Sequence, residues 1–183
     1  MMIETGRLIL RHWHESDAEE LYLYAKDPSV GPVAGWPPHT SIEDSREIIK
    51  TVFSAPETYA VVLKSIGKPV GCAGLMIGRH SNLHLPDDEC EIGYWIGVPY
   101  WGQGLIPEAV VCLQRRAFAE LGMKKMWCGY FDGNHKSRRV QEKCGFRYHH
   151  TDNNACNEFI SGINTAHISC LSKEQWLSDQ INK

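Results

Sequence analysis

The residues with the clearest chemical potential lie where an apolar run gives way to a glycine loop and a helix-like segment. The apolar run ends at Pro99, the loop glycines are Gly102 and Gly104, and helix-forming residues follow at once. Backbone N–H groups in such a loop and in the first helical turn lack internal partners and point toward any anion placed there. Glycine lets the ligand approach closely because it has no Cβ. The pattern predicts a site for a phosphorylated cofactor.

Two common phosphate-binding motifs do not fit this loop. No Lys-Ser or Lys-Thr pair follows the second glycine, as it would in a nucleotide-triphosphate loop. The third glycine of a dinucleotide fingerprint, with its spacing, is also missing. The loop must therefore be matched to a different cofactor class.

Three blocks of sequence supply that match. They are Glu4 to Arg11, then Gly93-Tyr-Trp with Pro99-Tyr-Trp-Gly-Gln-Gly and Glu108-Ala109, then Asn134-His-Lys-Ser137 with Glu142-Lys-Cys-Gly-Phe146. In this order they resemble the GNAT N-acetyltransferase superfamily, and within it the branch that acetylates the N-termini of ribosomal proteins. Three ordered blocks indicate the family, but they do not specify the acceptor.

The resemblance implies acetyl-coenzyme A as co-substrate, with no metal. The positions that match the family's cofactor contacts are Trp95, Ile96, Gly97, Gly102, Gln103, Gly104, Leu105, Ile106, Asn134 and Ser137. In the family, the loop amides surround the pyrophosphate at the positive end of the helix dipole, and the pantetheine arm pairs with backbone of the preceding strand. The side chains of Trp95 and Ile96 equally fit a plain core, and Pro99 is expected to end the strand.

Acetyl transfer requires a neutral amine and a stabilised thiolate. Glu91 is the candidate general base, because in the family pattern it faces the loop region; a charged strand end beside Asp87, Asp88 and Glu89 is the alternative. An α-amine, with a pKa of about 8, needs less help than a lysine at about 10.4. The acidic cluster could also attract a cationic substrate.

For the thiolate, many superfamily members use a tyrosine seven residues after the motif asparagine, where this chain has Gln141. The N-terminal-acetylating branch instead has a serine, which is Ser137 here and could donate a hydrogen bond to the coenzyme sulfur. The alternative roles are a helix N-cap for Ser137 and a turn residue for Asn134.

The acceptor is expected between the proline-rich loop around Gly31 to His39 and the loop from Arg79 to Asp88. Trp36, His39 and Glu91 are the candidate lining residues, although Trp36 could simply pack inside the protein. The favoured acceptor is a protein or peptide N-terminal α-amine, acetylated by direct attack in a ternary complex. A small-molecule amine (polyamine, aminoglycoside or amino acid) is the alternative, and an acyl-CoA-binding module without turnover is a third reading.

Composition bounds the remaining possibilities. A chain of 183 residues suits one domain, here residues 1–183, and the net charge of −3 disfavours a nucleic-acid partner. No apolar run reaches the roughly 18 residues of a membrane span, and no secretory signal is visible. Seven cysteines without a Cys-x-x-Cys pair favour reduced thiols in a cytoplasmic protein over zinc or disulfides. A monomer or homodimer is expected.

Hydrophobic periodicity predicts one α/β (α+β) domain with a mixed, mostly antiparallel sheet of about six or seven strands flanked by helices. The expected strands are residues 7–12, 58–63, 70–77, 90–98, 125–131, 146–151 and 163–171. The expected helices are residues 16–26, 40–54, 105–121 and 137–143, with another from residue 172. Capping boxes at Ser16 and Ser172 mark two helix starts.

Overall fold

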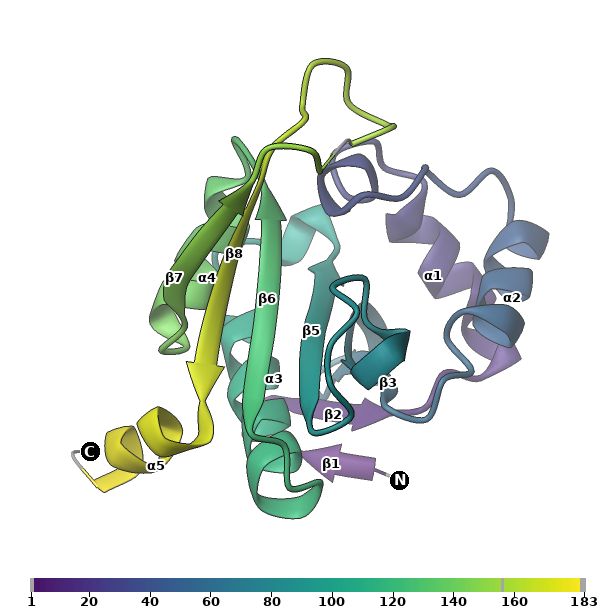
Figure 1. Cartoon of the computed structure of the whole chain (residues 1–183). Coiled ribbons are helices and arrows are strands. Elements are labelled where there is room, and N and C mark those ends of the chain that lie inside the picture. Colours follow the sequence, from purple (N-terminus) through teal and green to yellow (C-terminus); the bar gives the residue numbers. More distant parts are fainter. Residues whose placement is uncertain (1, 156, 182–183) are drawn as a thin grey trace. The chain divides into compact units, whose positions relative to one another are not determined.

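The computed structural model describes residues 2–155 and 157–181, shown in Figure 1. These residues form two compact units, each described here by itself. The first contains the chain up to Gly74 with Tyr94–Ala109 and Glu158–Ser161; the second contains Leu75–Gly93, Val110–Asn157 and the segment from Gly162.

The described residues form eight strands and five α-helices. The strands are β1 (Met2–Glu4), β2 (Leu8–Arg11), β3 (Thr58–Leu63), β4 (Lys68–Ile77), β5 (Glu89–Ile96), β6 (Lys125–Phe131), β7 (Arg147–Asp152) and β8 (Ala166–Ser172). The helices are α1 (Ala18–Ala25), α2 (Ile42–Thr51), α3 (Leu105–Arg115), α4 (His135–Lys143) and α5 (Lys173–Ile181). A π-helical turn, Arg116–Glu120, continues α3.

The hydrogen-bonded strand order is β1-β2-β3-β4-β5-β6-β8-β7. The pairs β1–β2, β2–β3, β3–β4, β6–β8 and β7–β8 are antiparallel, while β5 and β6 are parallel. The prediction of a mixed, mostly antiparallel sheet with helices is confirmed. The described residues form one strand more than the six or seven expected. The strand that was missed is β1, because it has only three residues and shows no alternation in the sequence.

The first unit packs α1 and α2 around a core rich in aromatic residues. Leu21 and Ala25 of α1 and Ile49 of α2 are buried in the same cluster as Trp13 and Trp95. Helix α2 begins after Ser41, whose hydroxyl accepts a hydrogen bond from the Asp44 amide. This cap satisfies one of the free amides of the first turn.

Strands β4 and the end of β5 approach each other unusually closely at Gly71 in the first unit. A Cβ at this position would lie 2.4 Å from the Trp95 carbonyl oxygen and 2.9 Å from the Ile96 Cα. The Gly97 amide donates to the Val70 carbonyl at 2.9 Å, which holds the two segments at this separation. Only glycine fits here without moving backbone.

We therefore expect Gly71→Ala to destabilise the protein by about 1–3 kcal/mol, the usual range for overpacking. Chemical denaturation would measure the loss. Gly93→Ala is the matched control, because its new Cβ would meet only the end of the flexible Met76 side chain, at 3.5 Å. Equal losses in the two variants would show that the close approach at Gly71 is not a constraint.

The second unit is built on the adjacent strands β6 and β8, with β7 at the edge (Figure 1). Helix α4 follows β6 and α5 follows β8. The Ser172 hydroxyl accepts from the Gln175 amide while the Gln175 side chain accepts from the Ser172 amide. The capping box predicted at Ser172 is confirmed.

Three local predictions are corrected by the structure. Ser16 does not start α1: a 3-10 turn, Glu15–Asp17, comes first, because Asp17 accepts from the His14 amide and binds Arg11 through both oxygens. Strand β5 ends at Ile96, before Pro99, which lies in a 3-10 turn. Helix α4 begins two residues earlier than expected, at His135.

Candidate active site

The glycine loop has the backbone conformation that its sequence predicts. Gly102 and Gly104 have φ angles of +75° and +74°, in the left-handed region that favours glycine. Helix α3 begins directly afterwards at Leu105, and its first internal hydrogen bond runs from the Glu108 amide to the Gly104 carbonyl. The amides that precede Glu108 in the first turn are therefore positioned to meet an anion.

Arg7 braces this loop, a role that the sequence did not reveal. Its Nη1 donates to the Gln103 carbonyl at 2.9 Å, and its Nε donates to Glu108 Oε2 at 2.7 Å. The Thr5 hydroxyl and the Arg7 amide donate to the other oxygen of Glu108. Partial burial alone would raise the pKa of Glu108, but these hydrogen bonds lower it below its ordinary value. The carboxylate thus ties the turn before β2 to the first turn of α3.

The guanidinium also supplies positive charge beside the loop. The Arg7 side chain is half exposed, and a Cβ at Gly104 would lie 3.6 Å from Arg7 Nη2. A cation next to a glycine loop with outward amides suits a pyrophosphate. In the sequence, the presence of Arg7 and Glu108 in the quoted motif blocks was the one indication that they act at this loop.

We expect Arg7→Gln to raise the dissociation constant of coenzyme A by about threefold to tenfold, because it removes both the brace and a charge. Isothermal titration at two salt concentrations would measure this, with the larger loss at low salt. Arg46→Gln removes the same charge from exposed helix α2 and should leave the affinity unchanged. An unaltered constant in Arg7→Gln would assign the arginine to folding alone.

The end of β5 presents buried side chains. Trp95 and Ile96 are each 9% exposed, which agrees with the core role considered for both. The Trp101 indole donates to the Ile96 carbonyl at 2.9 Å. A Cβ on Gly97 would lie 2.6 Å from the Tyr24 ring, so only a bare backbone fits at this point.

Trp36 and His39 lie together in the first unit. The Trp36 ring centroid is 5.7 Å from that of Trp95 and 5.4 Å from that of His39. His39 Nδ1 is 2.8 Å from the Ser45 hydroxyl, and burial lowers the pKa of the imidazole. Both side chains are thus packed internally, which was the alternative for Trp36. Contact with an acceptor stays a prediction.

Glu91 is held by one of its two carboxylate oxygens in the second unit. Its Oε2 accepts from the Ser81 hydroxyl at 2.8 Å and from the Asn82 amide at 2.9 Å. The Leu83 amide donates to the Ser81 hydroxyl, which directs the Ser81 proton toward Glu91. Within residues 2–155 and 157–181, Oε1 accepts no hydrogen bond. The carboxylate is fixed in orientation while one oxygen stays available.

Two of the three acidic residues before Glu91, Asp88 and Glu89, are paired with lysines. Asp88 is 2.6 Å from the Lys124 amine, and this hydrogen bond lowers the pKa of the Asp88 carboxyl. Glu89 is 3.2 Å from the Lys125 amine and also accepts from the Trp127 indole at 2.6 Å. The cluster therefore presents less negative charge than the sequence suggests.

Asn134, Ser137 and Gln141 form one stripe of α4. The Asn134 side chain accepts from the Ser137 amide at 3.1 Å and is the N-cap. The suggestion that Ser137 is the cap is therefore wrong: Ser137 lies in the first turn. Gln141 Nε2 is 3.4 Å from the Ser137 hydroxyl. The capping role of Asn134 does not test its predicted contact with the cofactor.

The described parts of the chain contain no group of three His, Cys, Asp or Glu side chains that could hold a metal. None of the described helices is long and apolar enough to cross a membrane.

A family model described as an acetyltransferase (GNAT) domain matches residues 7–147. The chain belongs to the GNAT family. It is accordingly an acyl-CoA-dependent N-acetyltransferase, and acetyl-CoA is its co-substrate. The glycine loop and Arg7 fit this cofactor, since they offer outward amides and a cation to its phosphates.

The GNAT chain is also similar to individual proteins. The putative ribosomal N-acetyltransferase YdaF of Bacillus subtilis (strain 168) is 41% identical over 71 residues, which cover 39% of this chain and 38% of that protein. A structure of the microcin self-immunity acetyltransferase MccE with acetyl-CoA and AMP has a TM-score of 0.73 at 20% identity, covering 92% of this chain and 93% of that one.

A third similarity is to a structure of a spermidine N-acetyltransferase SpeG chimera from Vibrio cholerae and hSSAT. It has a TM-score of 0.74 at 16% identity and covers 94% of this chain and 99% of that one. At these identities the two structures establish the shared fold. The acceptors in their names belong to those proteins.

Proposed function

We propose that this GNAT enzyme acetylates the N-terminal α-amine of a protein or peptide by direct attack in a ternary complex. The observation that carries the proposal is the geometry of Glu91, whose Oε2 is held by Ser81 and Asn82 while Oε1 accepts no hydrogen bond from the described residues. One oriented carboxylate suffices for an α-amine, because its pKa of about 8 lies only about one unit above neutral pH, whereas that of a lysine, about 10.4, lies more than three units above it.

In the proposed mechanism Glu91 is the general base and Ser137 stabilises the leaving group. Glu91 takes a proton from the ammonium, directly or through water, and the neutral nitrogen attacks the thioester carbonyl. The carbon–sulfur bond then breaks, the electron pair leaves on the coenzyme sulfur, and the surplus proton on the acylated nitrogen passes to that thiolate, which gives the amide and free coenzyme A. Ser137 donates a hydrogen bond to that sulfur, and a thiol pKa of about 8.5 makes the thiolate a tolerable leaving group.

The loop amides and Arg7 bind the pyrophosphate, and the backbone of Trp95 to Gly97 binds the pantetheine arm. Similarity to the putative ribosomal N-acetyltransferase over 71 residues supports the protein acceptor. The proposed acceptor lining is Trp36, His39 and Glu91.

The second candidate is a small amine such as a polyamine, supported by similarity to a spermidine N-acetyltransferase structure. One observation weighs against it. Asp88 and Glu89 are paired with Lys124 and Lys125, so this cluster offers a polycation little free negative charge.

Competition among acceptors tests the proposal. The purified enzyme would be incubated with acetyl-CoA and equal amounts of N-terminal peptides, lysine peptides, spermidine and an aminoglycoside. Mass spectrometry would identify the acetylated products. We expect the peptide α-amine to be acetylated first. Preferential acetylation of spermidine or the aminoglycoside would overturn the proposed acceptor while leaving the acetyltransferase intact.

A further inference from the structure

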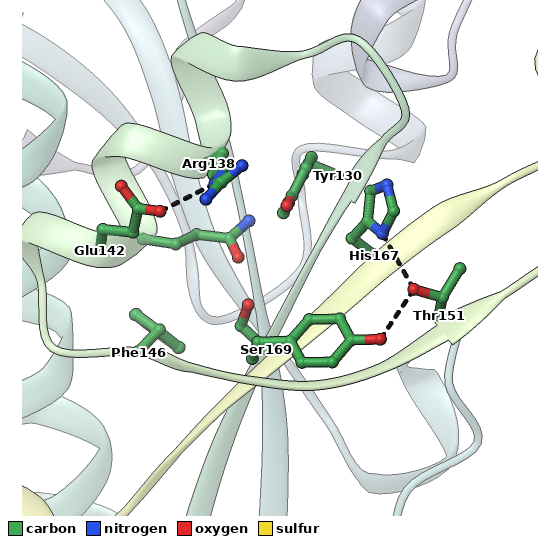
Figure 2. A pocket seen from close by; sticks show the side chains of 9 residues that line it. Tyr130, Arg138, Glu142, Phe146, Thr151, His167 and Ser169 are labelled. Carbon is green, nitrogen blue, oxygen red and sulfur yellow. Dashed lines mark hydrogen bonds and ion pairs between the residues drawn. The ribbon is translucent and has the colours of Figure 1, made fainter.

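A pocket of about 390 Å³ opens in the second unit between α4, β6, β7 and β8 (Figure 2). Its size falls within the range of small-molecule sites, about 300–1,000 Å³. None of the residues assigned to cofactor, base or acceptor lines it. Aromatic side chains of Tyr130, Phe146 and Tyr148 form part of its wall, while Gln141 and Ser169 contribute buried polar groups.

One buried side-chain atom of Gln141, which lines this pocket, has no hydrogen-bond partner among the described residues. Its side-chain Nε2 donates to the Gly129 carbonyl at 3.3 Å. A carbonyl oxygen can only accept, so the nitrogen must face Gly129 and the orientation of the amide is fixed. The residue is 2% exposed, and its Oε1 has no hydrogen-bond partner among the described residues. A buried acceptor without a donor is costly, which calls for a donor from outside the chain.

The charged side chains of the pocket and several of its other polar groups are paired with neighbouring residues. Figure 2 shows Arg138 bound to Glu142, with Nε 2.8 Å from Oε1. It also shows Thr151 bound to His167 at 3.0 Å, and the same hydroxyl lies 2.9 Å from that of Tyr148. Charges are therefore compensated within the wall. The pocket selects against ions and favours a neutral molecule.

Aromatic walls add a requirement for shape. Planar molecules stack or pack edge-on against tyrosine and phenylalanine rings. Water is the alternative donor for Gln141 Oε1, but a pocket of 390 Å³ also has room for a larger molecule. The buried Ser169 hydroxyl offers a second polar contact.

We propose that this pocket binds a neutral, planar heteroaromatic molecule that carries an amino or ring N–H donor, of the size of a nucleobase. The donor bonds to Gln141 Oε1, and the ring packs against Tyr130 and Tyr148. No residue of the glycine loop lines this pocket, and the proposal does not depend on which amine the enzyme acetylates.

The test uses two bicyclic probes that differ by one donor, 3-aminoquinoline and quinoline. Isothermal titration of the full chain at neutral pH should give one saturable site, with at least tenfold tighter binding of the amine. Gln141→Met should bind the two probes equally, since it removes the acceptor and keeps the length. Ser169→Leu should weaken both probes at least tenfold because it fills the pocket.

Lys143→Met, an exposed change on α4 outside the pocket, should bind both probes like the unaltered protein. Thermal melting and coenzyme A titration confirm that each variant is folded. Three results overturn the proposal: no saturable binding up to the solubility limit, equal affinity for both probes in the unaltered chain, or displacement of the amine by coenzyme A. The first means that water alone occupies the pocket, and the last places the probe in the cofactor site.

Discussion

Gly104→Val should raise the dissociation constant of coenzyme A by at least about tenfold, equivalent to about 1.4 kcal/mol. Gly104 has a φ of +74°, a conformation that costs a β-branched residue about 1–3 kcal/mol. The new side chain would also meet Arg7, whose Nη2 lies 3.6 Å from the position of the Cβ. The loop can relax only by turning its amides away from the pyrophosphate, so the affinity falls. Isothermal titration measures it directly.

Gly67→Val is the matched control for this experiment. Gly67 also has a positive φ, +65°, and its Cβ would meet nothing within 4 Å. The two variants therefore carry similar backbone strain, but only one carries it in the loop. Gly67→Val should lose stability and keep its affinity. If folded Gly104→Val also binds coenzyme A normally, the loop is not the pyrophosphate site.

Glu91→Gln should lower kcat by about a hundredfold, within the usual range for loss of a general base. Glutamine keeps an oxygen that can accept from Ser81 and Asn82, so the local structure should persist. It cannot take a proton from the ammonium. Coenzyme A affinity should stay within about twofold because the change lies outside the glycine loop. Steady-state kinetics and titration together measure both quantities.

Glu89→Gln provides the corresponding control two residues earlier on β5. Its carboxylate is engaged by Lys125 and Trp127, and we expect kcat to stay unchanged. An unaltered kcat in Glu91→Gln would remove Glu91 as the base. A large loss in both variants would point to disturbed folding of β5 instead.

Local patterns in the sequence were enough to locate much of the fold. Strands β3 and β6 have the predicted bounds, Thr58–Leu63 and Lys125–Phe131, because their runs of mostly apolar and aromatic residues end at turn signals. The glycine loop was also predicted from the sequence, since two closely spaced glycines directly before a helix are typical of an anion-binding turn. Strand ends and tight turns depend on residues that are neighbours in the chain, so they can be predicted from the sequence.

Features decided by a choice between possible contacts were not predicted. The role of Arg7 follows from its contacts with Glu108 and Gln103, about a hundred residues away. Ser16 failed as a helix start because Arg11 recruits Asp17 into an ion pair first. Ser137 was taken for a possible cap, although Asn134 three residues earlier fills that place. In each case a competing contact, absent from the local pattern, decided the outcome.

The brace at Arg7 also has a consequence for how the protein folds. The contact between Arg7 and Glu108 closes a chain separation of 101 residues, and contacts of such high order form late because loop-closure entropy must be overcome first. The cofactor loop should therefore reach its final shape only near the end of folding. If coenzyme A binds that shape as proposed, it stabilises the native state by mass action, and the time course of its binding during refolding would report the last folding step.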